Sequence, residues 1–157
     1  MTAKFAKKAK PPKWREGNKI VNYTRVSDPS QFDNTSLETQ RKDAITFATK
    51  RSFEIKAFFG GEAESAKTDE RKEFKLMLNY VRKNKDVVAI LVYSFERFSR
   101  SDHAQELIID LGKIGVKVIS VLQDIDVTSP AGELQQQIFF AFGKYDNDLR
   151  RTKTMRG

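Results

Sequence analysis

Residues 86–93, DVVAILVY, form an unbroken apolar run about as long as one strand. Such a run fits a strand that is buried on both faces, which is where the strands of a parallel sheet lie. Three further β-rich segments, residues 19–27, 53–61 and 116–122, alternate with helical patterns along the chain. This alternation predicts an α/β domain in which helices flank a mostly parallel central sheet.

The helical segments are marked by apolar spacing and by residues that favour helix ends. A capping box of Thr35 and Glu38 predicts the first helix, which continues through Leu37, Ala44 and Ala48. A second helix is expected over residues 69–84, and a third is expected to start at a Ser101/Asp102 cap and to stop near Gly115. The last helix is expected from residue 133, apolar at first and basic later.

The net charge of +8 is concentrated at the two ends of the chain, while the middle is nearly balanced. Residues 1–18 contain Pro11-Pro12 and lack apolar periodicity, which predicts a basic flexible arm before a domain over residues 19–145. The cations of this arm should act as diffuse charge toward DNA phosphates, and they are Lys4, Lys7, Lys8, Lys10, Lys13 and Arg15.

The residues that suggest chemistry follow the ends of the predicted strands. Arg25 and Ser27 are two apart at a strand end and therefore share a face. This spacing suggests that Ser27 is a nucleophile and that Arg25 holds the anion it attacks. Arginine binds phosphate through a planar fork of donors, and a serine attacking phosphorus needs such neutralisation without requiring a metal. The other basic residues at strand ends or helix starts are Arg71, Lys72, Arg97 and Arg100.

Two alternatives to a serine nucleophile stay open on the residues alone. Asp124 and Asp126 form a DxD at a strand end and suit Mg²⁺ in a nuclease or phosphatase. The arginines could instead hold a phosphate ligand in a non-catalytic module. The chain has no cysteine and one histidine, which excludes disulfides and a multi-histidine metal site, and is compatible with a reducing cytoplasm.

Four segments, YTRVS, SLETQ, DERKEF and FERFSR, together resemble the signatures of the serine recombinase catalytic domain of the resolvase/invertase type. The resemblance covers residues 19–157 and points to the N-terminal domain of a large serine recombinase or transposon integrase. It implies site-specific DNA recombination, in which a serine cleaves the phosphodiester to a 5′-phosphoserine intermediate before strand exchange and religation. It implies no cofactor and no metal.

The resemblance also assigns roles to individual residues. It implies Ser27 as the nucleophile beside Arg25, Gln40 as the active-site glutamine, and Arg71 with Lys72 beside it as the arginine that follows a mobile loop. It places Arg97 and Arg100 in a D-R-[LF]-x-R motif that begins here with Glu96 in place of the usual aspartate.

The family's partners are also implied. They are DNA and further copies of the chain, as a homodimer and as a tetramer in the synaptic complex, in the cytoplasm and without a membrane. Residues 146–157 resemble the start of a long dimerisation and DNA-contacting helix that is cut short, so the isolated chain is expected to be nearly inactive. The last helix, expected from residue 133, has apolar residues on two sides, Phe139 and Phe140 among them. We therefore expect one set to pack on the sheet and the other to face a partner.

Overall fold

The computed structural model describes residues 14–25, 36–60, 70–99 and 103–156. Four parallel strands form one sheet in the order β2-β1-β3-β4, which confirms the predicted α/β fold. The elements in chain order are β1 (Lys19–Thr24), α1 (Leu37–Lys50), β2 (Glu54–Gly60), α2 (Glu70–Lys83), β3 (Val87–Val92), the 3₁₀ turn η1 (Phe95–Arg97), α3 (Ala104–Lys113), β4 (Lys117–Ser120) and α4 (Pro130–Arg156).

The sheet separates two apolar clusters of unequal size. The smaller cluster joins Ala44 and Ala48 of α1 to one face of β1 and β3. On the other face the larger cluster joins α2, α3 and α4 to β1, β3 and β4. All six residues of β3 are buried, because this central strand is covered on both faces, as its apolar run predicted.

Two helices start at residues other than the predicted ones. The N-cap of α1 is Ser36, whose hydroxyl accepts the Thr39 amide at 3.1 Å, so the capping box that we placed on Thr35 and Glu38 is wrong by one residue. For α3 the cap position is His103, which makes no side-chain capping bond. The cap expected there from Ser101 and Asp102, like Thr35, lies outside the described residues.

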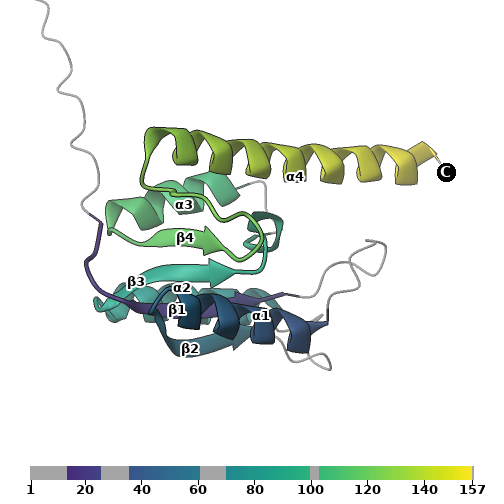
Figure 1. Cartoon of the computed structure of the whole chain (residues 1–157). Helices are drawn as coiled ribbons and strands as arrows, with labels where there is room; N and C mark the ends of the chain where they lie inside the picture. Colours follow the sequence, from purple (N-terminus) through teal and green to yellow (C-terminus); the bar gives the residue numbers. More distant parts are fainter. Residues whose placement is uncertain (1–13, 26–35, 61–69, 100–102, 157) are drawn as a thin grey trace, which may run out of the picture.

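The long helix α4 begins at Pro130, three residues before the predicted start. Proline suits a first helical position, and the Ser129 hydroxyl accepts the Gly132 amide at 3.0 Å. A β-carbon on Gly132 would lie 1.7 Å from the Asp126 carbonyl oxygen, so only glycine fits there. The helix then runs without a break across the boundary predicted between residues 145 and 146, and its second half projects beyond the sheet (Figure 1).

A side-chain hydrogen bond braces the turn that leads into α4. Asp126 Oδ1 accepts both the hydroxyl and the amide of Thr128, and the hydroxyl bond is the larger reason why the pKa of Asp126 lies below its usual value. A lowered carboxyl pKa favours the folded state at neutral pH. This contribution is lost as the pH falls through the lowered pKa.

Arg15 is bound to the domain and does not act as diffuse charge, so its assignment to the arm is wrong. Its guanidinium donates to four main-chain carbonyls at 2.9–3.1 Å, and its own amide donates to Gly115 at 2.9 Å. Carbonyls at helix ends lack partners within the helix and carry partial negative charge, which explains why a cation is held there. The four acceptors, on α2, α3, β3 and the residues next to them, are Val81, Asn84, Val87 and Ile114.

We expect Arg15→Ala to lower the free energy of unfolding by about 1–2 kcal/mol, since it removes charge-assisted hydrogen bonds from a partly exposed side chain. Urea unfolding followed by circular dichroism measures this change. The control is Lys13→Ala, which removes a charge two residues earlier in the same basic segment and should leave the stability unchanged. Equal effects of the two substitutions would contradict the anchoring role of Arg15.

Candidate active site

Candidate site residues gather at the carboxyl edge of the sheet, where the arrowheads of β3 and β4 point in Figure 1. Arg25 follows β1 directly, η1 follows β3, and Gln40 lies in the first turn of α1. Because all strands are parallel, these chain segments meet at one edge, which is where open α/β sheets bind ligands.

Hydrogen bonds join Arg25, Gln40, Glu96 and Arg97 into one group, which we call the arginine clasp. The Arg25 guanidinium donates to the main-chain carbonyls of Glu96 at 2.7 Å and Arg97 at 3.3 Å. In return, the Arg25 carbonyl accepts Arg97 Nη1 at 3.2 Å and Gln40 Nε2 at 3.4 Å. The clasp therefore holds both the side chain and the main chain of Arg25, two residues before Ser27.

Arg97 is the buried arginine of the clasp, with 4% of its surface exposed. Burying a guanidinium is costly unless it is hydrogen-bonded or lies against an aromatic ring. The Arg25 carbonyl supplies a hydrogen bond, and Cζ of Arg97 lies 5.5 Å from the centroid of the Tyr93 ring. This environment fixes the orientation of Arg97 at the sheet edge.

Glu96 takes part in the clasp through its main chain. Its side chain is exposed, and the bond from Arg25 ends on its carbonyl oxygen. Any residue at this position offers the same carbonyl. Glutamate in place of the aspartate expected from the resemblance therefore leaves this contact available.

The other predicted site residues are not joined to the clasp by the described contacts. Ser27 and Arg100 lie outside the described residues. Arg71 and Lys72 lie exposed in the first turn of α2, which follows β2 in the chain. The structure thus brings together Arg25, Gln40, Glu96 and Arg97, and the catalytic roles of all eight residues stay predictions.

The two aspartates of the metal-dependent alternative have other partners. Arg51 donates to both carboxylate oxygens of Asp124, one of them at 2.7 Å, and Asp126 accepts from Thr128 in the turn before α4. Within residues 14–25, 36–60, 70–99 and 103–156, no three His, Cys, Asp or Glu side chains gather closely enough to hold a metal ion. Each of the two aspartates thus has a partner within the described part of the chain.

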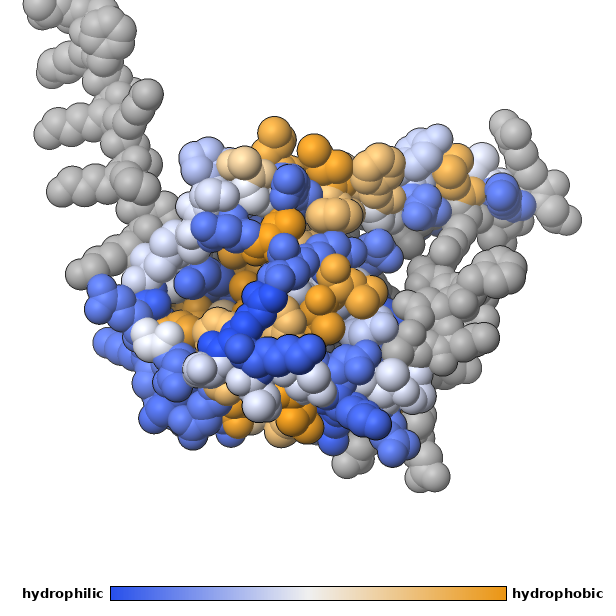
Figure 2. All heavy atoms as spheres, in the orientation of Figure 1, coloured by the Kyte–Doolittle hydropathy of each residue, from blue (hydrophilic) through white to orange (hydrophobic). Residues whose placement is uncertain are grey.

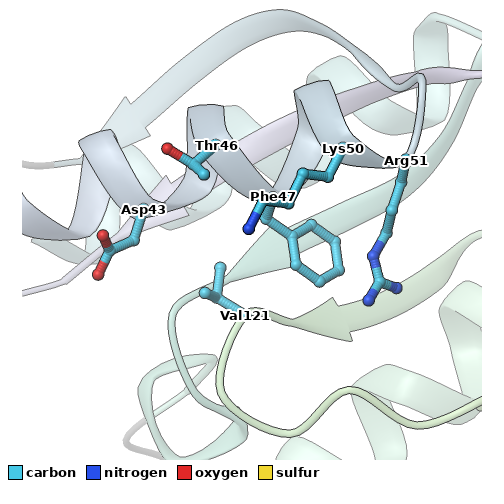
Figure 3. A pocket seen from close by; sticks show the side chains of 6 residues that line it. All are labelled: Asp43, Thr46, Phe47, Lys50, Arg51 and Val121. Atoms are coloured by element: carbon cyan, nitrogen blue, oxygen red, sulfur yellow. The ribbon is translucent and has the colours of Figure 1, made fainter.

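An open hollow of about 520 Å³ lies beside the C-terminal half of α1 (Figure 3). Its lining includes Phe47, Lys50, Arg51 and Val121, and shares no residue with the clasp. Cζ of Arg51 lies 4.1 Å from the centroid of the Phe47 ring, and Arg51 also binds Asp124. The hollow is therefore separate from the candidate active site, and its arginine is already engaged by a carboxylate.

The helix α4 has a buried side and an exposed apolar side, as predicted. Phe140 and Gln136 are buried against the domain, and the Gln136 amide donates to the Val118 carbonyl at 2.9 Å. The exposed large apolar residues of α4 recur at helical spacing: Leu134, Ile138, Phe142, Tyr145 and Leu149. Figure 2 shows orange surface along the top of the molecule, where α4 lies in Figure 1. Among the helices that the structure describes, α4 included, none has the length and apolar character needed to cross a membrane.

The fold and the clasp define a class of protein: a parallel α/β domain that holds paired arginines at the carboxyl edge of its sheet. Residues 20–157 match the family model described as "Resolvase, N terminal domain". The chain belongs to this family, and it is therefore a catalytic domain of site-specific DNA recombination.

Solved structures with the same fold support this membership. The N-terminal catalytic domain of TP901-1 integrase is 25% identical, with a TM-score of 0.62 over 84% of this chain and 98% of that one. A resolvase family site-specific recombinase from Streptococcus pneumoniae is 28% identical, with a TM-score of 0.63 over 88% and 94% of the two chains. The catalytic domain of ISC1926 TnpA, an IS607-like serine recombinase, shares the fold at 22% identity, with a TM-score of 0.52 and 76% of each chain covered. Among curated proteins, none matches this chain.

Proposed function

We propose that Ser27 is the nucleophile of this recombinase domain and that the arginine clasp prepares the site for its attack. The observation that carries the proposal is the double hold on Arg25, whose side chain and carbonyl are both bound two residues before Ser27. Because the main chain is held at Arg25, fewer positions are open to the residues that follow it, Ser27 included. Such positioning lowers the entropy cost of bringing a nucleophile to its target.

The proposed step is a transfer of the DNA phosphate to serine. Ser27 Oγ loses its proton and forms a bond to phosphorus, while the bond from phosphorus to the 3′ oxygen breaks. The 3′ oxygen takes up a proton and leaves as a hydroxyl, which balances the proton lost by Ser27. Negative charge increases on the phosphoryl oxygens, and nearby guanidinium groups stabilise it. We assign this task to Arg25, Arg97 and Arg100, with Arg71 and Lys72 of α2 as further cations.

The 5′-phosphoserine link keeps the energy of the broken bond, so the 3′ hydroxyl of another strand can attack it and release Ser27. Exchange of strands requires several catalytic domains on one DNA complex. The exposed apolar side of α4 offers a surface for a second copy, and exposed Arg151 and Lys153 further along α4 suit DNA phosphates. We therefore propose a homodimer, and a tetramer when two sites pair, acting on DNA in the cytoplasm.

A cleavage reaction in excess EDTA tests this proposal against the metal-dependent alternative. The chain, fused to a DNA-binding domain of known site, is incubated with supercoiled DNA, and the products are run with and without protease treatment. We expect cleaved DNA that carries covalently bound protein, with equal yield in EDTA and in Mg²⁺. Cleavage that needs Mg²⁺ and leaves no protein on the DNA would contradict the proposal.

A further inference from the structure

Helix α4 packs on η1, the turn that carries Arg97. The contact is made by four aromatic rings, Phe139 and Phe140 of α4 and Phe95 and Phe98 in and beside η1. The Phe140 ring lies 5.7 Å from the Phe95 ring and 6.3 Å from the Phe98 ring, measured between centroids. Phe139 lies 6.0 Å from Phe95. Because Phe95 and Phe98 have no exposed surface, the position of η1 depends on how these rings fit together.

One turn further along α4, Gly143 brings the helix backbone close to η1. A β-carbon on Gly143 would lie 3.7 Å from Cγ of Glu96, which is an ordinary van der Waals distance. Phe140 and Gly143 are three residues apart and thus lie on the same side of the helix. This side of α4 therefore faces η1 over a full helical turn.

The 3₁₀ segment η1 contributes two members of the clasp, Glu96 and Arg97. Two acceptors of the Arg25 guanidinium among the described residues are η1 carbonyls, and Arg97 lies between Phe95 and Phe98 in sequence. On the β4 side, Gln123 Oε1 accepts the Phe95 amide at 3.1 Å, so this contact and α4 brace η1 from two elements. Closely packed interiors transmit displacements from one element to the next. We therefore expect a shift of α4 to move the Glu96 and Arg97 carbonyls that bind Arg25.

We propose that Phe140 is a positioning residue for recombination, through which α4 sets the geometry of Arg25 and Arg97. The inference rests on the proposed function of these arginines as phosphate ligands. Phe140 does not belong to the clasp itself. Its effect passes through η1.

The test compares Phe140→Leu, which removes the buried ring but keeps apolar bulk, with Phe142→Leu on the exposed side of the same helix. The first readout is the ¹⁵N–¹H resonance of the arginine Nε–H groups. Arg25 Nε donates to the Arg97 carbonyl, so its proton should exchange slowly in the wild type. We expect Phe140→Leu to shift this resonance and speed its exchange.

Two internal controls accompany this spectrum. Arg15 Nε donates to the Ile114 carbonyl outside the clasp, so its resonance should stay unchanged in both variants. Gly143→Ala adds only the β-carbon that already fits, and should leave the Arg25 resonance in place. If Phe140→Leu folds with an unchanged Arg25 resonance, or if Phe142→Leu shifts it equally, the positioning role is refuted.

The second readout is single-turnover DNA cleavage by the same fused chains. Misplaced catalytic groups reduce rates by roughly 10- to 100-fold, and we expect Phe140→Leu to fall in this range while DNA affinity stays unchanged. A wild-type rate together with a shifted Arg25 resonance would also refute the positioning role. If the resonance shifts but the wild type forms no covalent DNA complex, the proposed function fails and the structural coupling of α4 to the clasp stands.

Discussion

Replacing Ser27 with alanine is expected to abolish covalent DNA cleavage, while the domain stays folded and binds DNA as before. Loss of a nucleophilic serine costs roughly 10⁶-fold in rate in a well-studied enzyme, because no other group replaces the attacking oxygen. Cleavage should therefore fall below detection. The measurement is the yield of protein–DNA complex from supercoiled DNA in EDTA, with circular dichroism to verify folding.

Mass spectrometry of the wild-type complex then locates the bond. After nuclease and protease digestion, the nucleotide should remain on the peptide that contains Ser27. The control is Ser30→Ala, which removes a hydroxyl from the same segment and should leave cleavage close to that of the wild type. A nucleotide found on Ser30, Ser36 or a tyrosine would show that Ser27 is not the nucleophile.

Replacing Arg97 with alanine should reduce the rate of DNA cleavage by about 10²–10³-fold, as expected when one donor to a charged transition state is removed. The substitution also takes away one of the two described donors to the Arg25 carbonyl and the cation beside the Tyr93 ring. Single-turnover cleavage measures the rate, and urea unfolding measures the accompanying loss of stability.

Arg41 provides a matched control for Arg97. Its guanidinium also binds a main-chain carbonyl, that of Gly60 at 3.1 Å, and also lies near an aromatic ring, 5.4 Å from the centroid of Phe58. Arg41 lies outside the clasp, so Arg41→Ala should affect stability but leave cleavage near the wild-type rate. Near-normal, salt-tolerant cleavage by Arg97→Ala, or an equal loss in Arg41→Ala, would argue against a catalytic role for the clasp.

The sequence alone was sufficient to predict the fold, because its signals are local. The apolar run of β3 requires burial on both faces, and the helical spacing of Met77, Leu78 and Val81 requires one buried side of α2. The two sides of α4 could be predicted in the same way. Helix starts were less certain, since Thr35 and Ser36 both suit an N-cap and only the position of the Thr39 amide chooses Ser36.

The clasp could be predicted only in part. The motifs indicated Arg25, Gln40, Glu96 and Arg97 as site residues, but not that the bonds joining them end on main-chain carbonyls. Every residue has a carbonyl, so the sequence carries no signal for such an acceptor. Phe95 and Phe98 flank Arg97 in the sequence, and two aromatic residues in so short a segment indicate that another element packs against this turn.

Arg15 shows the same limit at a second place. In sequence it is one of six cations that precede the domain, and nothing distinguishes it from the lysines before it. Its four acceptors come from segments 66 to 99 residues away, and only the folded chain brings them together. The sequence by itself determined the elements, their order and the identity of the candidate residues. The tertiary structure decided their hydrogen-bond partners, because these are main-chain groups whose positions depend on how the elements pack.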